Sequence, residues 1–352
     1  MKITYEDIKP YIEKGLISEQ SHPEDENVRV FNYTHACQYE KAWDKITNQC
    51  RGLIMNIKTG EILARPFPKF FNYQEHVINN WPIPDENPII TEKLDGSLGI
   101  LYTLNGKTRV ATRGSFTSDQ AVWATNWWKE NKGDEPYGND ITYLVEIIYP
   151  ENRIVVNYDF SGLVHITSLY TETGLVVPDS DKAGLLPIRK VKRVYNKDLK
   201  TLLEMDEENS EGFVLFYPNA NIRMKIKFPE YVRLHKIVTG LSEIGIWEML
   251  RDGADFTPFL ERVPDEFMDW LNKIKNDLEE RFNEIESCCE TLVHFAKRYH
   301  PRKEQARFIM DNDNKEYSGV VFAMLDGKDY KRIIWRSLRP HGHSQFKIDE
   351  DL

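Results

Sequence analysis

The hydrophobic pattern divides the chain into two parts. From about residue 28 to residue 235, short apolar runs of strand length alternate with turn residues, whereas after residue 236 apolar side chains recur at three- and four-residue steps. The first pattern is typical of β-strands and the second of helices. We therefore predict an α+β fold, with a domain built on antiparallel sheets over residues 1–236 and an all-helical C-terminal domain over residues 237–352.

Two hairpins are the clearest local features of the first domain. One joins residues 52–57 to residues 61–64, and the other joins residues 99–104 to residues 107–112 across Asn105-Gly106, a pair suited to a type I′ turn. A helix with a Ser or Thr cap is expected at residues 118–128. Further strands are expected at residues 143–148, 154–158, 164–170, 212–217 and 222–228.

The second domain contains one long amphipathic helix. Its apolar positions fall on one face and are Phe267, Leu271, Ile274, Leu278, Phe282, Ile285, Cys289, Leu292 and Phe295. Shorter helices are expected at residues 242–250, 302–310 and 328–338.

The composition restricts the class of protein. A hydrophobic fraction of 41% and a charged fraction of 29% are typical of an ordinary folded protein. No apolar run approaches the length of a membrane span, and the N-terminus does not resemble a secretory leader. The four cysteines include no CxxC pair, so we expect reduced thiols and a cytoplasmic location. A net charge of -10 argues against bulk coating of nucleic acid but not against a local basic groove.

Lys93 is the leading candidate for covalent chemistry. It stands in a KxDG motif after the apolar residues 88–90 and before the Asn105-Gly106 hairpin, so it should emerge at the end of a strand. An amine attacks phosphorus only when it is unprotonated, and neighbouring cations or a bound metal favour that form. By itself the motif is a weak signal, and a solvated surface turn is the alternative.

Other charged residues could complete a site around this lysine. Glu211 opens one apolar strand, and Lys225 and Lys227 lie on one face at the end of the next, where they could hold phosphate oxygens. Lysines that protect an edge strand are the alternative for this pair. Glu146 is a lone acid in an apolar strand and needs a partner, which could be a ribose hydroxyl, a metal or a salt bridge.

Six blocks in a fixed order carry a resemblance to a known family. They are residues 50–54, 65–72, 93–97, 144–146, 211–214 and 225–227. Their order and spacing resemble those of the covalent nucleotidyltransferases, which include RNA ligases, DNA ligases and mRNA capping enzymes. Within that superfamily the likeness is to the first RNA ligase family, the phage-type ligases that repair broken tRNA anticodon loops.

The resemblance implies a three-step reaction. Lys93 attacks the α-phosphorus of ATP in the presence of Mg²⁺ (or Mn²⁺), AMP passes from the lysine to an RNA 5′-phosphate, and an RNA 3′-hydroxyl displaces AMP. The first domain would be the adenylyltransferase, and the helical domain would select the RNA. The partner would be tRNA or another single-stranded RNA with 5′-phosphate and 3′-hydroxyl ends.

The resemblance also implies roles for individual residues. Lys225 and Lys227 would hold the α-phosphate, Glu211 would help to organise the metal, and Glu146 would contact the ribose. Glu92 would border the adenine pocket. Three cations would contact phosphates of ATP or RNA, and they are Arg51, Lys69 and Arg113.

Three alternatives use the same residues differently. A DNA ligase or a GTP-using capping enzyme would share the lysine chemistry, but both usually carry a small β-barrel where this sequence predicts helices. A catalytically silent RNA-binding relative would keep the fold without the reaction. We expect a monomer without membrane association, in the cytoplasm, or in the host cytoplasm if the source is viral.

Overall fold

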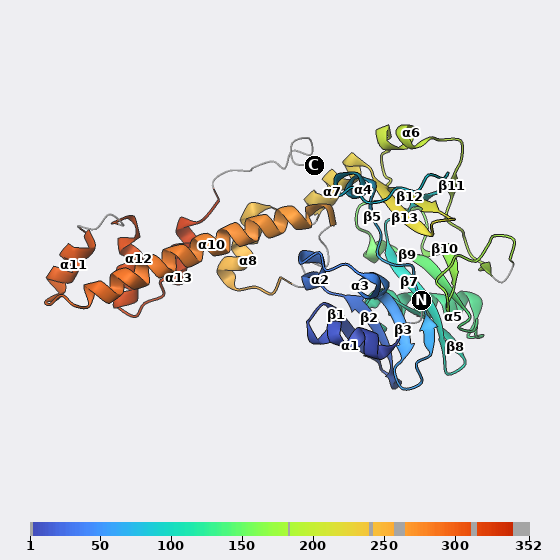
Figure 1. The fold of residues 1–352 in the computed structure, drawn as a ribbon, viewed down its shortest axis with the longest axis horizontal. Coiled ribbons are helices and arrows are strands. Elements are labelled where there is room, and N and C mark those ends of the chain that lie inside the picture. Colours follow the sequence, from blue (N-terminus) through green and yellow to red (C-terminus); the bar gives the residue numbers. More distant parts are fainter. Residues whose placement is uncertain (1–2, 182–183, 239–241, 257–264, 311–314, 341–352) are drawn as a thin grey trace. The chain divides into compact units, whose positions relative to one another are not determined.

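The chain folds into two units, which the computed structural model describes over residues 3–181, 184–238, 242–256, 265–310 and 315–340 (Figure 1). The units are Met1–Val238 and Thr239–Leu352. The first unit mixes helices with largely antiparallel sheets, and the second is helical. The predicted succession of an α+β part and a helical part is therefore confirmed.

The strands described in the first unit form three sheets. The N-terminal sheet has the order β1 (Ile17–His22), β2 (Asp25–Tyr33), β3 (Arg51–Asn56) and β4 (Ile62–Ala64). The central sheet has the order β10 (Gly162–Tyr170), β9 (Ile141–Ile148), β7 (Ser97–Leu104) and β8 (Lys107–Ala111). The lysine sheet has the order β11 (Arg193–Val194), β6 (Ile89–Lys93), β12 (Gly212–Tyr217), β13 (Ile222–Lys227) and β5 (Phe71–Asn72).

Helices cover the outer faces of these sheets. They are α1 (Tyr5–Glu13), α2 (His35–Tyr39), α3 (Lys45–Gln49), α4 (Tyr73–Ile78), α5 (Asp119–Lys132), α6 (Leu199–Glu204) and α7 (Pro229–Val238), with a 3₁₀ turn at Pro150–Asn152. Ile8 of α1 packs on the N-terminal sheet, Trp128 of α5 on the central sheet, and Tyr231 of α7 on the lysine sheet. The N-terminal and central sheets pack face to face through residues such as Ile54 and Ile100.

The two predicted hairpins and the capped helix are present. β3 pairs with β4 and β7 pairs with β8 in antiparallel register. At the second turn Asn105 and Gly106 have φ angles of +52° and +71°, as a type I′ turn requires. The Ser118 hydroxyl accepts a hydrogen bond from the amide of Ala121 and caps α5.

The second unit is built around one long helix. Its elements are α8 (Glu243–Asp252), α10 (Asp265–Ala296), α11 (Arg302–Met310), a 3₁₀ turn (Lys315–Tyr317), α12 (Ser318–Leu325) and α13 (Lys331–Ser337). The predicted apolar face of α10 is buried at Leu271, Leu278, Phe282, Ile285, Cys289 and Leu292. Phe295 lies in the same helix, as predicted, but is 42% exposed. None of the helices in the described part of the chain has the length and apolar character needed to span a bilayer.

The glycine that opens β12 is sterically required. Gly212 has a φ of +141°, and a Cβ there would lie 2.0 Å from the carbonyl oxygen of Ile226. We expect Gly212→Ala to lower the free energy of unfolding by more than about 2 kcal/mol, through strain and overpacking together.

The matched control is Gly60→Ala. Gly60 also has a positive φ, +75°, but has no neighbour within 4 Å of its ideal Cβ, so the change should cost only about 1 kcal/mol. Urea denaturation followed by tryptophan fluorescence compares the two variants, and equal losses would contradict the steric explanation.

Candidate active site

The pairing of three strands in the lysine sheet places the predicted site residues in register. Lys93 ends β6 directly opposite Gly212 of β12, and Gly212 is in turn opposite Lys227 of β13. Lys225 lies two residues before Lys227, so both side chains project from the same face. Residues that are far apart in the sequence therefore meet at one end of the sheet.

The Glu211 side chain contacts lysines of two strands, β6 and β13. Its side chain is buried, and its Oε1 atom lies 2.8 Å from Lys93 Nζ and 3.6 Å from Lys227 Nζ. Lys225 is also buried. The structure thus brings together four of the residues to which the sequence assigned catalytic roles, and the carboxylate balances part of the positive charge that they concentrate.

Glu146 approaches Lys93 from the central sheet. Its Oε1 atom accepts a hydrogen bond of 3.0 Å from the amide of Gly96. Burial raises the pKa of Glu146 to about 8, even though the nearby Lys93 ammonium acts in the opposite direction. A Cβ at Gly96 would lie 2.5 Å from the carbonyl oxygen of Ile147, so the glycine of the KxDG motif permits this close approach.

The aspartate of the same motif fixes the segment around Lys93. Asp95 Oδ2 accepts hydrogen bonds of 2.8 Å from the amides of Val155 and Val156, and its Oδ1 accepts one of 2.7 Å from the Tyr231 hydroxyl. The Asp95 amide donates to the Tyr158 hydroxyl. Sequence reasoning did not assign a role to Asp95, although its place in the KxDG motif was a signal.

The predicted strand over residues 154–158 was wrong. This segment is irregular, since two of its amides donate to Asp95 rather than to a neighbouring strand. The backbone amides of this β-like sequence therefore satisfy a buried carboxylate instead of a neighbouring strand.

A cavity of about 560 Å³ opens beside Lys93 and Glu146. Its walls are largely apolar and include Leu98, Ile166 and Val176. Glu92, the residue expected at the adenine pocket, also lines it, and its carboxylate accepts a hydrogen bond of 3.1 Å from the amide of Lys192. A largely apolar cavity that also carries charged groups is suited to a flat base attached to phosphates.

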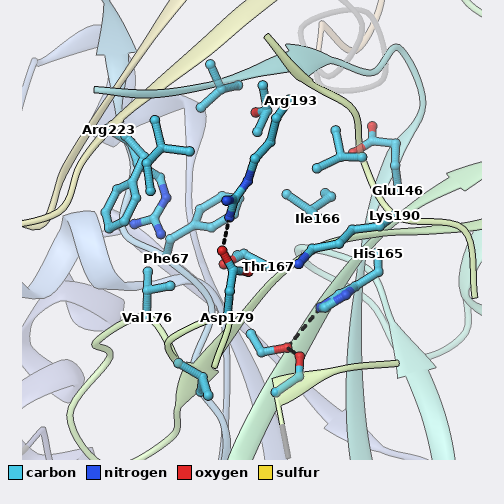
Figure 2. Close-up of a pocket in the computed structure, with 18 of the residues that line it drawn as sticks. Phe67, Glu146, His165, Ile166, Thr167, Val176, Asp179, Lys190, Arg193 and Arg223 are labelled. Atoms are coloured by element: carbon cyan, nitrogen blue, oxygen red, sulfur yellow. Dashed lines mark hydrogen bonds and ion pairs between the residues drawn. The ribbon is translucent and has the colours of Figure 1, made fainter. Parts of the chain in front are cut away.

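Arg223 is a cavity residue that sequence reasoning missed. Its guanidinium lies 5.2 Å from the ring centroid of Phe67 and 4.2 Å from that of Phe216, and Figure 2 shows it beside Phe67. Burial lowers its pKa to about 10. The period of two along β13, which places residue 223 on the face of Lys225 and Lys227, could have identified it.

A second group of charged residues lines another part of the cavity, and the sequence did not predict it. Asp179 pairs with Arg193 and with Lys190, the latter at 2.9 Å, and Figure 2 shows Asp179 and Arg193 pointing toward each other. The paired cations hold the pKa of Asp179 below its usual range, with the Lys190 hydrogen bond as the largest cause. Nothing in the spacing of these residues along the chain signalled their contact.

The three remaining predicted cations do not all lie at the cavity. Arg51 lines it, with its guanidinium 5.2 Å from the Phe67 ring centroid. Lys69 and Arg113 are not among the described lining residues and instead both contact Tyr33. Arg113 donates a hydrogen bond of 3.0 Å to the Tyr33 hydroxyl, and Lys69 Nζ lies 5.6 Å from that ring centroid.

Residues 49–231 match the model of the RNA ligase family, and the chain belongs to that family of enzymes. The chain is 23% identical to an RNA ligase of Rhodothermus phage RM378 over 86% of each chain. It is 28% identical to a putative bifunctional polynucleotide kinase/RNA ligase of Autographa californica nuclear polyhedrosis virus, over 79% of this chain and 46% of that protein. The chain thus spans less than half the length of the baculovirus protein.

Solved structures show a distant likeness. An archaeal ATP-dependent RNA ligase is 14% identical, with a TM-score of 0.45 over 80% of this chain and 79% of that chain. A putative ATP-dependent DNA ligase from Aquifex aeolicus is 14% identical, with a TM-score of 0.44 over 80% of each chain. Likeness at this level carries no argument about the reaction.

The raised pKa of Glu146 generates a pH-dependent prediction. In the folded state the carboxyl keeps its proton to about pH 8, whereas in the unfolded chain it loses the proton near its ordinary value of 4.5. The folded state therefore binds more protons between these values, and this group makes the protein less stable as the pH rises through that window.

We expect Glu146→Gln to remove this loss of stability at rising pH. Its free energy of unfolding should exceed that of the wild type by an amount that grows by about 1 kcal/mol or more between pH 5 and pH 8. Glu151→Gln, at an exposed acid nearby, is the control. Urea titrations at several pH values measure the difference, and a difference that stays constant with pH would contradict the assignment.

Tyr231→Phe tests the hydrogen bonds around Asp95. The change leaves one oxygen of a buried carboxylate without its hydroxyl donor, so we expect a loss of about 1.5–3 kcal/mol of unfolding free energy. Tyr195→Phe is the matched control, since Tyr195 is 70% exposed. Equal stability of the two variants in urea would show that the Tyr231 hydroxyl does not support the Asp95 carboxylate.

Proposed function

We propose that this protein is an ATP-dependent RNA ligase that works through a lysyl-AMP intermediate at Lys93. In the first step Lys93 Nζ forms a bond to the α-phosphorus of ATP while the bond to pyrophosphate breaks. In the second, the RNA 5′-phosphate displaces the lysine from phosphorus and takes the AMP. In the third, the RNA 3′-hydroxyl attacks the 5′-phosphate and AMP leaves.

The observation that carries this proposal is the position of the Lys93 amine. It lies 2.8 Å from Glu211, in a row that ends at Lys227, and it lines the cavity of about 560 Å³. Each step is an in-line displacement at phosphorus, for which positioning and charge neutralisation supply most of the rate. The family membership of residues 49–231 supports the same chemistry.

The charged residues that the sequence predicted for the site have the following roles in this proposal. Lys225 and Lys227 hold oxygens of the α-phosphate, Glu146 contacts the ribose, and Glu92 borders the adenine. Arg51, at the cavity wall, contacts the phosphates of ATP.

Lys69 and Arg113 form a separate cationic pair around Tyr33. We propose that they contact phosphates of ATP or RNA outside the cavity described above.

The ion pair with Glu211 has a consequence for reactivity. Because Lys93 Nζ attacks phosphorus as a free amine, it must be released from this ion pair before attack.

Magnesium fits this site as an ion shared with the substrate. The described residues contain no group of three or more His, Cys, Asp or Glu side chains arranged to hold a metal by themselves. Mg²⁺, or Mn²⁺ in its place, commonly uses one or two carboxylates together with substrate phosphates, and Glu211 offers such a carboxylate. A cation bound in this way would neutralise charge on the phosphate oxygens and compete with Lys93 for Glu211.

The two units would have different roles in the reaction. The unit Met1–Val238 carries all the residues assigned to ATP, so we propose it as the adenylyltransferase. The helical unit would select the RNA, with breaks in tRNA or in another single-stranded RNA as the substrate.

Labelling with ATP tests the covalent step directly. With ATP labelled at the α-phosphate and Mg²⁺, the wild-type protein should retain label through denaturing electrophoresis, and Lys93→Ala should lose it completely, because no other amine occupies this position. Lys58→Ala, at an exposed hairpin lysine, is the control and should label normally.

Parallel reactions separate the alternatives. Labelling with GTP in place of ATP would favour a capping enzyme, and sealing of nicked duplex DNA in place of 5′-phosphorylated single-stranded RNA would favour a DNA ligase. Absence of label under all conditions would overturn the proposal and leave a silent RNA-binding protein.

A further inference from the structure

A short segment of the helical unit reverses the charge of the rest of the chain. Residues 294–308 contain five Lys or Arg side chains and one acidic side chain, Glu304, in a protein whose net charge is -10. The five are Lys297, Arg298, Arg302, Lys303 and Arg307. Three aromatic residues are interleaved with them, namely Phe295, Tyr299 and Phe308.

The structure exposes two of these aromatic rings. Phe295 is 42% exposed and Tyr299 is 43% exposed, and they stand at the C-terminal end of α10 and in the turn that follows. Tyr299 stacks on Phe308 of α11 with ring centroids 5.0 Å apart and an interplanar angle of 22°. The Arg298 guanidinium lies 5.0 Å from the Phe295 ring centroid. In Figure 1, α11 folds back beside this end of α10.

Packing within the helical unit accounts for only part of this arrangement, because both rings remain exposed despite their contacts with Phe308 and Arg298. The apolar face of α10 is buried at Leu292 and Ala296, so the core is complete up to the last turn of the helix without Phe295. Arg302 belongs to the fold, because it pairs with Asp326 and donates to Gln305. Lys297, Arg298, Lys303 and Arg307 are exposed, and the last two lie four residues apart on one face of α11.

Exposed aromatic rings among Lys and Arg side chains are suited to binding single-stranded nucleic acid. Unpaired bases stack on aromatic faces, while Lys and Arg neutralise the phosphates between them, and together these contacts bind single strands with little sequence preference. A duplex keeps its bases stacked inside and offers its phosphates but no free base faces. An acidic protein would match the charge but would not require the two exposed rings.

We propose that Phe295, Lys297, Arg298, Tyr299, Lys303 and Arg307 form a binding surface for single-stranded RNA, called here the basic aromatic surface. Phe295 and Tyr299 stack on bases, and the four cations contact phosphates. The surface lies within the helical unit and is distinct from the ATP site. As an RNA-selecting surface of a ligase it rests on the proposed function, but RNA binding can be measured without ligation.

Two double variants of the full chain separate the stacking and charge contributions. Fluorescence anisotropy with a labelled, 5′-phosphorylated single-stranded RNA measures the dissociation constant over a range of salt concentrations. Phe295→Ala with Tyr299→Ala should weaken binding about tenfold or more with little change in salt dependence. Lys297→Ala with Arg298→Ala should weaken binding and reduce the slope of log K against log salt by about 1.4, about 0.7 for each lost phosphate contact.

The control removes the same charge from the same helix. Lys273→Ala with Arg281→Ala eliminates two exposed cations, and Lys273 lies about 35 Å along α10 from its C-terminal end. This variant should bind single-stranded RNA like the wild type. All variants should retain their helical circular dichroism and their ability to form lysyl-AMP, because the ATP site lies in the other unit.

The outcomes distinguish this inference from the proposed function. If both test variants bind single-stranded RNA as tightly as the control variant, the basic aromatic surface is overturned. If only the charge variant weakens, and a duplex binds as well as the single strand, base stacking is overturned. A wild-type protein that fails to form lysyl-AMP but loses RNA binding in both test variants would overturn the ligase and leave the surface standing.

Discussion

The register of β6, β12 and β13 is the constraint on which the site depends. It sets Gly212 between Lys93 and Lys227, and the absence of a side chain at Gly212 leaves room for the backbone of β13. Glu211, the preceding residue, can then reach both lysines with one carboxylate. A slip of one residue in either pairing would turn the lysines to the opposite face, and the row of charges would be lost.

A second sheet completes the site through the loop after Lys93. Asp95 ties that loop to residues 155–156 and to α7, and Gly96 allows Glu146 of the central sheet to approach. The hydrogen bonds of Asp95 compensate for burying its charge, whereas Glu146 has fewer compensating contacts and responds with a raised pKa. The site therefore combines firmly held groups with one whose protonation depends on its surroundings.

The errors of sequence-based prediction at this protein have physical causes. Residues 154–158 have the β-branched composition of a strand, but two of their amides are taken by Asp95. Phe295 lies in α10 as its periodicity predicts and is nevertheless 42% exposed, because periodicity reports which face a residue occupies and not whether that position is buried. Arg223 shares the face of Lys225 and Lys227, but its contact with Phe67 depends on how distant segments fold together, which strand alternation does not encode.

The sequence by itself determined the local elements and the family, because turn chemistry, side-chain alternation and motif order are written in nearby residues. It fixed the Asn105-Gly106 turn, the strand at residues 212–217 and the helix at residues 302–310. Only the tertiary structure decided that Asp179 meets Arg193 and Lys190 at the cavity and that Lys69 and Arg113 meet at Tyr33. Those contacts depend on how separate segments cross in space, and no periodicity along the chain encodes that distance.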